Sequence, residues 1–219
     1  MKIRAVLDAR KEPHARVVEE VAKVVFRGGT VIFPTDTVYG IGCDPYDPLA
    51  VERLYGAKDR PEHKPLTLHL ATVTEFLEYV TGNREASWVG RRLFPGPVTI
   101  VVRRPAFIAK TVTSGLHTLG FRVPDDTLCS AILERCGPLA ATSANISGAR
   151  AYTGGGSPKD LPKADLLVEN GPTRYGREST VLDLSGPDPV LLREGVVAAA
   201  RIRELLDPVS RHPVTQPTS

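Results

Sequence analysis

The sequence predicts a mixed α/β protein, in which the sheet contains both parallel and antiparallel strands. In the first half of the chain, short apolar runs alternate with segments whose apolar residues recur at helical spacing. In the last third, apolar runs follow one another with little helical pattern between them. The 219 residues, 42% of them hydrophobic, can bury one full core. We therefore expect one domain over residues 1–207 and a disordered, proline-rich tail over residues 208–219.

The elements expected in the first half alternate in type. Valines at positions 17, 21, 24 and 25 recur at helical spacing, and Gly28-Gly29 ends that helix. Asp47 is placed to cap the next helix, with Pro48 in its first turn. The expected elements are strand Ile3–Leu7, helix Pro13–Gly28, strand Val31–Phe33, helix Asp47–Lys58, strand Leu66–Leu70, helices Thr74–Val80 and Arg84–Leu93, and strand Val98–Arg103.

The second half is expected to be richer in strands. Its expected elements are strand Thr118–Val123, helix Asp125–Cys136, strands Leu139–Thr142, Leu166–Glu169, Ser179–Leu184 and Val190–Arg193, and helix Ala198–Leu206. The segment Ala149–Pro162 contains Gly154-Gly155-Gly156 and is predicted to be the least structured interior stretch. This segment could be a lid that closes over a ligand, or simply a flexible linker.

Composition and missing motifs narrow the function. The net charge of +3 permits contact with nucleic acid without arguing for it. Three cysteines without CxxC spacing favour free thiols in a reducing cytoplasm, and no stretch approaches transmembrane length. The chain lacks a P-loop, a GxGxxG turn, a GxSxG elbow and an HExxH pair, and its five histidines have no metal-ligand spacing. We expect a cytoplasmic protein with no membrane contact and no protein-bound metal site.

A cluster of cations follows the helix that Asp47 caps. Lys58, Arg60 and Lys64 lie in and just after the last turn of this helix. The small hydroxyl residues Thr35 and Thr37 follow the expected strand Val31–Phe33. This arrangement is suited to a polyanion such as a phosphate chain. Alternatively, Lys58 and Arg60 are exposed charges that only complement the helix dipole.

Further polar residues lie near the ends of other expected strands: Thr118, Ser143, Asn145 and Ser179, with Arg122 and Arg193. Each alone is typical of a turn or cap, and His69 alone is typical of a packed histidine. Together with Thr35, the six residues of this list could converge on one crevice, as ligand sites in open α/β sheets do. Strand alternation places Thr118, Gly120 and Arg122 on one face, opposite Leu119 and Phe121.

Seven sequence segments resemble the YrdC/Sua5 family of threonylcarbamoyl-AMP synthases, in the family's order. They are GGTVIFPTDTVYGIGCDP, AKDRPEHKPLTLHLA, FPGPVTIVV, GLHTLGFRVPDD, PLAATSANISG, ESTVLDLSG and VLLREG, and they span Gly28 to Gly195. The chain is similar to the short form, which has only the YrdC domain. Two positions depart from the common pattern: Asp36 stands where glutamate is common, and Glu194 stands where proline often follows the arginine.

The resemblance implies a YrdC-like fold, which is a twisted open α/β sheet with flanking helices and a basic concave face. It also implies a nucleotidyltransferase reaction. L-threonine, bicarbonate and ATP with Mg²⁺ would give threonylcarbamoyl-AMP and pyrophosphate, for the t6A modification of tRNA. The expected partners are a downstream threonylcarbamoyl transferase complex and, on the basic face, tRNA or double-stranded RNA.

The resemblance also assigns roles to individual residues. Lys58 and Arg60, the expected catalytic residues, match a KxR motif that holds ATP phosphates. Ser143 and Asn145 match an SxN motif on the nucleotide, and Thr118 and Arg193 fall at ATP-contacting positions. The positions around threonine are Thr35, His69, Arg122, Ala141 and Ser179. Arginine grips a carboxylate with two parallel hydrogen bonds, so Arg122 is expected to bind the threonine carboxylate.

Two other functions remain open from the sequence. One is a carbamoyl-transfer enzyme like the hydrogenase maturation proteins, although these carry zinc modules and this chain has no CxxC. The other is an RNA-binding module without catalytic activity, but 6% aromatic residues and no interleaved basic–aromatic run argue against base stacking.

Overall fold

One continuous sheet of ten strands forms the centre of the computed structural model, which describes residues 3–58, 65–146, 148–156 and 161–207. The strands are β1 (Ile3–Asp8), β2 (Val31–Phe33), β3 (Gly40–Cys43), β4 (Thr67–His69), β5 (Val98–Arg103), β6 (Thr118–Arg122), β7 (Leu139–Ser143), β8 (Ala164–Glu169), β9 (Thr180–Asp183) and β10 (Val190–Arg193). The helices are α1 (His14–Val25), α2 (Pro48–Ala57), α3 (Val73–Tyr79), α4 (Arg84–Leu93), α5 (Thr127–Cys136) and α6 (Ala199–Leu206).

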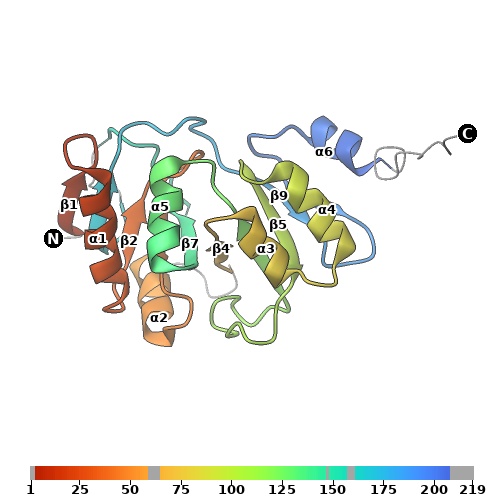
Figure 1. The fold of residues 1–219 in the computed structure, drawn as a ribbon, viewed down its shortest axis with the longest axis horizontal. Helices are drawn as coiled ribbons and strands as arrows, with labels where there is room; N and C mark the ends of the chain where they lie inside the picture. Colours follow the sequence, from red (N-terminus) through yellow and green to blue (C-terminus); the bar gives the residue numbers. More distant parts are fainter. Residues whose placement is uncertain (1–2, 59–64, 147, 157–160, 208–219) are drawn as a thin grey trace, which may run out of the picture.

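The sheet is mixed, as expected from the sequence. Its strand order is β1-β8-β2-β3-β7-β4-β6-β5-β9-β10. The pairs β1/β8, β2/β8, β4/β6 and β5/β9 are parallel, and the other neighbouring pairs are antiparallel. β1 and α6 lie at opposite ends of the long axis, with α1 and α5 near the β1 end of the sheet and α3 and α4 nearer the α6 end (Figure 1).

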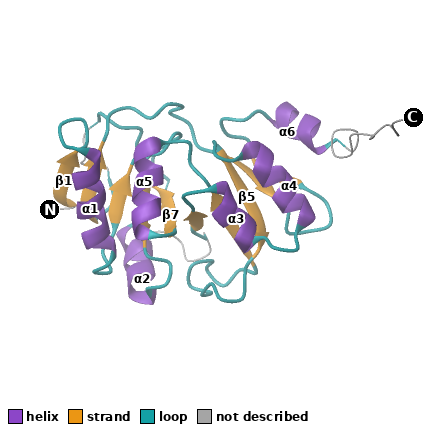
Figure 2. Cartoon of the chain, in the orientation of Figure 1, coloured by secondary structure: helices purple, strands orange, loops and turns teal. Residues whose placement is uncertain are grey.

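Helices pack on both faces of the sheet. On β2, Val31 and Phe33 join the apolar cluster that includes α1 and α5, whereas Ile32 joins the cluster that includes α2, α3 and α4. Because side chains alternate along a strand, these clusters lie on opposite faces. The helix pairs α1/α5 and α3/α4 each lie side by side (Figure 2). The helices α1 and α5 cover only part of their face of the sheet. The part of that face formed by β4, β6, β5 and β9 stays uncovered, and the polar residues of the predicted site lie there.

Local sequence patterns predicted the helices and strands well, with the exception of β3. Asp47 caps α2 by accepting from the backbone N–H groups of Leu49 and Ala50, and Pro48 occupies the first turn. The expected connection from Phe33 to α2 instead contains β3, which pairs with β2 and β7. Gly40 and Gly42 give this segment little intrinsic strand preference, so its pairing partners decide its conformation.

Some expectations fall outside the described residues. These are Arg60, Lys64 and the disordered tail over residues 208–219, so the domain division stays a prediction, as does the basic face. Among the described residues, no helix has both the length and the apolar character needed to cross a membrane.

Candidate active site

A row of cross-strand partners forms the floor of a cleft of about 670 Å³. The row runs across β7, β4, β6, β5 and β9 through Ala141, Thr67, Gly120, Val101 and Asp183. Directly opposed residues carry their side chains on the same face of a sheet. A Cβ atom on Gly120 would lie 3.1 Å from Thr99 Cγ2 and 3.3 Å from Thr67 Oγ1. Because Gly120 has no side chain, the middle of the cleft floor stays open to a ligand.

Every predicted site residue that the structure describes lines this cleft: Thr35, Lys58, His69, Thr118, Arg122, Ala141, Ser143, Asn145, Ser179 and Arg193. They come from seven separate stretches of the chain, so the expected convergence on one crevice is confirmed. Arg60 lies outside the described residues. What each residue binds stays a prediction.

Lys58 is buried, which argues against the alternative that it is an exposed charge at the end of α2. It follows the last residue of α2 and is only 1% exposed. Its Nζ donates to the main-chain oxygen of Ser143 and lies 3.4 Å from both Thr142 Oγ1 and Asn145 Oδ1. Ser143 Oγ in turn donates to Asn145 Oδ1 at 2.5 Å. The KxR lysine and the SxN residues thus form one network at the end of β7.

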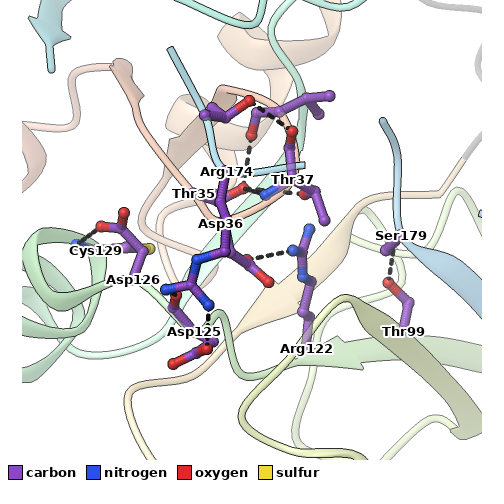
Figure 3. Close-up of polar contacts among 12 residues, drawn as sticks. Thr35, Asp36, Thr37, Thr99, Arg122, Asp125, Asp126, Cys129, Arg174 and Ser179 are labelled. Atoms are coloured by element: carbon purple, nitrogen blue, oxygen red, sulfur yellow. Dashed lines mark hydrogen bonds and ion pairs between the residues drawn. The ribbon is translucent and has the colours of Figure 1, made fainter. Parts of the chain in front are cut away.

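Arg122 lies on β6 and forms a buried ion pair with Asp36. Its Nη2 donates to Asp36 Oδ1 at 2.5 Å, and Figure 3 shows this contact. The two side chains are 6% and 0% exposed. Burial raises the pKa of the Asp36 carboxyl, and the positive charge of Arg122 opposes that rise. Arg122 stays protonated because a guanidinium is not deprotonated in proteins. Sequence reasoning missed this partner, noting Asp36 only as a departure from the common glutamate.

A tight turn between β2 and β3 directs Asp36 toward Arg122. Thr35 Oγ1 donates to the main-chain oxygen of Val38 at 2.6 Å and accepts from the Thr37 N–H at 3.2 Å. The main-chain oxygen of Asp36 accepts from the Tyr175 N–H at 3.0 Å. The small hydroxyl residues of PTDT therefore shape the turn, and Thr35 also lines the cleft.

His69 stands directly opposite Arg122 in the β4/β6 pairing. Burial, assisted by the nearby charge of Arg122, lowers the pKa of His69 to about 3. The Phe33 ring meets the imidazole edge-to-face, with centroids 6.1 Å apart. His69 is thus a packed histidine, as expected, and it also presents a neutral ring to the cleft.

Arg193 on β10 belongs to a second polar network. Its Nε donates to the main-chain oxygen of Ser179 at 3.1 Å, and its Nη1 donates to Glu178 Oε2 at 2.9 Å. Ser179 Oγ lies 2.9 Å from Thr99 Oγ1, and Figure 3 shows the pair. This network holds Ser179 against the cleft floor.

Asp183 and several apolar residues complete the cleft at the β9 side, and sequence reasoning missed them. The apolar residues there are Val101, Leu116, Val181 and Leu192. Asp183 Oδ1 accepts from the Ser185 N–H at 2.8 Å. Aspartate is depleted in strands, and alternation puts Asp183 on the face of Val181 and Ser179, so the signal was present in ESTVLD.

The described part of the predicted mobile loop is anchored. The carboxylate of Glu169 accepts from the Tyr152 hydroxyl at 2.6 Å, the Tyr39 hydroxyl at 3.2 Å and the Gly155 N–H at 3.2 Å. Gly154 has φ +93°, and a Cβ atom there would lie 1.9 Å from the Gly171 oxygen. The segment has no regular secondary structure through Gly156, but it is held to β8.

The comparisons with known proteins agree with this geometry. A family model for the Sua5/YciO/YrdC domain, described as "Telomere recombination", matches residues 23–195. The chain belongs to this family. The match therefore confirms the resemblance seen in the sequence motifs.

The relatives within the family are similar over most of this chain. Threonylcarbamoyl-AMP synthase of Pyrococcus abyssi is 36% identical over 88% of this chain and 58% of its own length. The protein of the same name from Bacillus subtilis is 36% identical over 88% of this chain and 57% of its own length. A crystal structure of P. abyssi Sua5 complexed with L-threonine superposes with a TM-score of 0.84, at 33% identity, covering 94% of this chain and 61% of that one. The chain thus spans about 60% of the length of these relatives.

Proposed function

We propose that this chain is a threonylcarbamoyl-AMP synthase acting in the t6A modification of tRNA. The names of the relatives support the reaction, and the complex of P. abyssi Sua5 with L-threonine supports the amino acid. The observation that carries the proposal is the convergence of Lys58, Ser143, Asn145 and Arg122 on one cleft. Such a cleft can hold a polyphosphate and a carboxylate side by side.

The proposed ligand positions follow the two networks of the cleft. The phosphates of ATP contact Lys58, Ser143, Asn145, Thr118 and Arg193. The threonine carboxylate pairs with Arg122, and the rest of the amino acid meets Thr35, His69, Ala141 and Ser179. Asp183 and the apolar residues beside it take the nucleoside, with the carboxylate accepting from a ribose hydroxyl or a base amine.

The reaction needs positioning more than covalent catalysis by the protein. The threonine amine combines with bicarbonate, losing water, to give a carbamate. A carbamate oxygen then attacks the α-phosphorus of ATP, and pyrophosphate leaves. Arg122 orients the amino acid for this attack, and Lys58 and Arg193 stabilise the charge on the phosphates. His69, neutral because burial lowers its pKa, adds no positive charge beside an amine that must itself be neutral to react.

Mg²⁺ enters as part of the ATP substrate in this proposal. Among the described residues, no group of three or more His, Cys, Asp or Glu side chains is placed to hold a metal ion. The phosphates themselves can supply most of the ligands, because Mg²⁺ keeps several waters and takes few protein carboxylates in such sites. The product would pass to a threonylcarbamoyl transferase complex in the cytoplasm, with tRNA or double-stranded RNA as a further contact.

Pyrophosphate release tests the proposal. We expect release only when ATP, Mg²⁺, L-threonine and bicarbonate are all present, with threonylcarbamoyl-AMP detected by mass spectrometry. Release that persists without threonine would contradict the synthase assignment and favour another adenylate- or carbamoyl-transfer reaction. Absence of release with folded protein that binds RNA would favour the RNA-binding alternative.

A further inference from the structure

Arg122 is held in place by a side chain that does not itself reach the cleft. Arg122 lines the cleft, whereas Asp36 is 1% exposed and is not among the lining residues. Their contact is the 2.5 Å bond from Nη2 to Oδ1 that Figure 3 shows. Asp36 can therefore influence a ligand through Arg122 but does not touch one in this arrangement.

The bond uses only part of the arginine. Arg122 Nε and Asp36 Oδ2 are both buried and have no hydrogen-bond partner among the described residues. A guanidinium binds a carboxylate best through two parallel N–H donors. With Asp36 taking one edge of the group through Nη2, donors remain for a second carboxylate. Because Nε is buried, a ligand in the cleft would reach the remaining Nη donors of the group rather than Nε.

Asp36 is itself fixed by its own turn and by the backbone of Tyr175. It lies in the turn closed by Thr35 and Thr37, and its main-chain oxygen accepts from the Tyr175 N–H. Next to it, Arg174 Nη1 pairs with Asp125 Oδ2 at 2.5 Å, but that pair is about half exposed. A fixed carboxylate can orient a neighbouring arginine before any ligand arrives, which reduces the entropy lost on binding.

We propose that Asp36 is a positioning residue, which orients Arg122 so that its unused donors grip the carboxylate of the amino-acid substrate. The proposal rests on the proposed function, because it takes that substrate to be L-threonine. It differs from a purely structural role in one respect: loss of Asp36 should weaken amino-acid binding without weakening nucleotide binding.

The test is a double-mutant cycle on Asp36→Asn and Arg122→Lys, read by calorimetry with L-threonine and, separately, with ATP. Asp36→Asn keeps the shape and removes the charge. We expect its threonine dissociation constant to rise about tenfold, with less than a twofold change for ATP. In the Arg122→Lys background, Asp36→Asn should have little further effect on threonine. Asp125→Asn, which removes a charge from the neighbouring exposed pair, is the matched control and should leave both constants unchanged.

Several outcomes would overturn the proposal. They are an unchanged threonine constant in folded Asp36→Asn, equal weakening for threonine and ATP, or an undiminished effect in the Arg122→Lys background. If Asp36→Asn does not fold, Asp36→Ser carries the test, since it removes the carboxylate with a smaller side chain; it should weaken threonine binding and leave ATP binding intact. A wild-type protein that binds no threonine would instead refute the proposed function.

Discussion

Two arginines line the same cleft in opposite environments. The side chains of Arg122 and its partner Asp36 are 6% and 0% exposed, whereas those of Arg193 and its partner Glu178 are 43% and 42% exposed. Both are arginine–carboxylate pairs, so access of water is the main difference between them. A buried pair holds one geometry, while an exposed pair is screened by water and salt and exchanges partners readily. The cleft thus combines a fixed cation with an adaptable one.

The largest expected effect is a difference in the free energy of unfolding between variants of the two ion pairs. Arg122→Ala leaves the Asp36 charge buried without its partner and should lower the free energy of unfolding by about 3–5 kcal/mol. Arg193→Ala removes an exposed pair and should cost about 1 kcal/mol or less. Urea denaturation of both variants measures the difference. Equal losses would mean that burial does not distinguish the two pairs.

Lys58, the third cation of the cleft, should behave as a buried functional group. Lys58→Ala is expected to reduce pyrophosphate release about 10²–10³-fold, the usual effect of removing one preorganised donor from a reacting charge. Because the Lys58 side chain is 1% exposed and hydrogen-bonded to the end of β7, the melting temperature of the Lys58→Ala protein should also fall. Lys23→Ala on the exposed face of α1 is the control and should change neither quantity. A large stability loss with normal specific activity would assign Lys58 a purely structural role.

A charge-conserving change tests the geometry at each arginine. Arg122→Lys keeps the charge but loses the planar fork, so threonine affinity should fall by roughly ten- to over a hundredfold, equivalent to about 1.5–3 kcal/mol. ATP affinity should barely change. Arg193→Lys should show the reverse preference, with a smaller loss confined to ATP. Equal weakening of both ligands by Arg122→Lys, measured by calorimetry, would place Arg122 on the phosphates.

The buried side of the cleft should also respond to pH through His69. Its folded-state pKa of about 3 lies below the ordinary value of 6.5, so its stabilising contribution is complete above pH 6.5 and decreases as pH falls toward 3. The slope approaches about 1.4 kcal/mol per pH unit for this one proton. His69→Gln should flatten the slope between pH 6.5 and 5. An unchanged slope in His69→Gln would show that His69 is not held neutral by burial.

The smallest expected effect concerns Asp183 on the apolar side of the cleft. If Asp183 binds the nucleoside as proposed, Asp183→Asn should weaken one hydrogen bond and raise the KM for ATP about fivefold, equivalent to about 1 kcal/mol. The KM for threonine should stay constant. Asp188→Asn, in the exposed turn before β10, is the matched control. Steady-state kinetics with each substrate varied in turn measures both constants. A change in the KM for threonine would instead assign Asp183 to the amino-acid site.

Local sequence patterns were sufficient for much of the fold and for part of the site. Asp47 and Pro48 marked the start of α2 because capping depends only on neighbouring residues. Alternation placed Thr118, Gly120 and Arg122 on the cleft face because that geometry is internal to one strand. The order of seven motifs was enough to indicate the family that the comparisons confirm.

What the sequence could not decide were the partners across the sheet. Asp36 and Arg122 are 86 residues apart, and Lys58 reaches the Ser143 carbonyl 85 residues away. The strand identity of β3 depends on β2 and β7, and the cleft floor depends on a register shared by five strands. Local propensity acts through neighbours along the chain, whereas the burial and pairing of a charge are set by residues that only folding brings together. The sequence by itself thus determined which side chains could form the site, and the tertiary structure decided which of them are fixed by burial and which stay open to water.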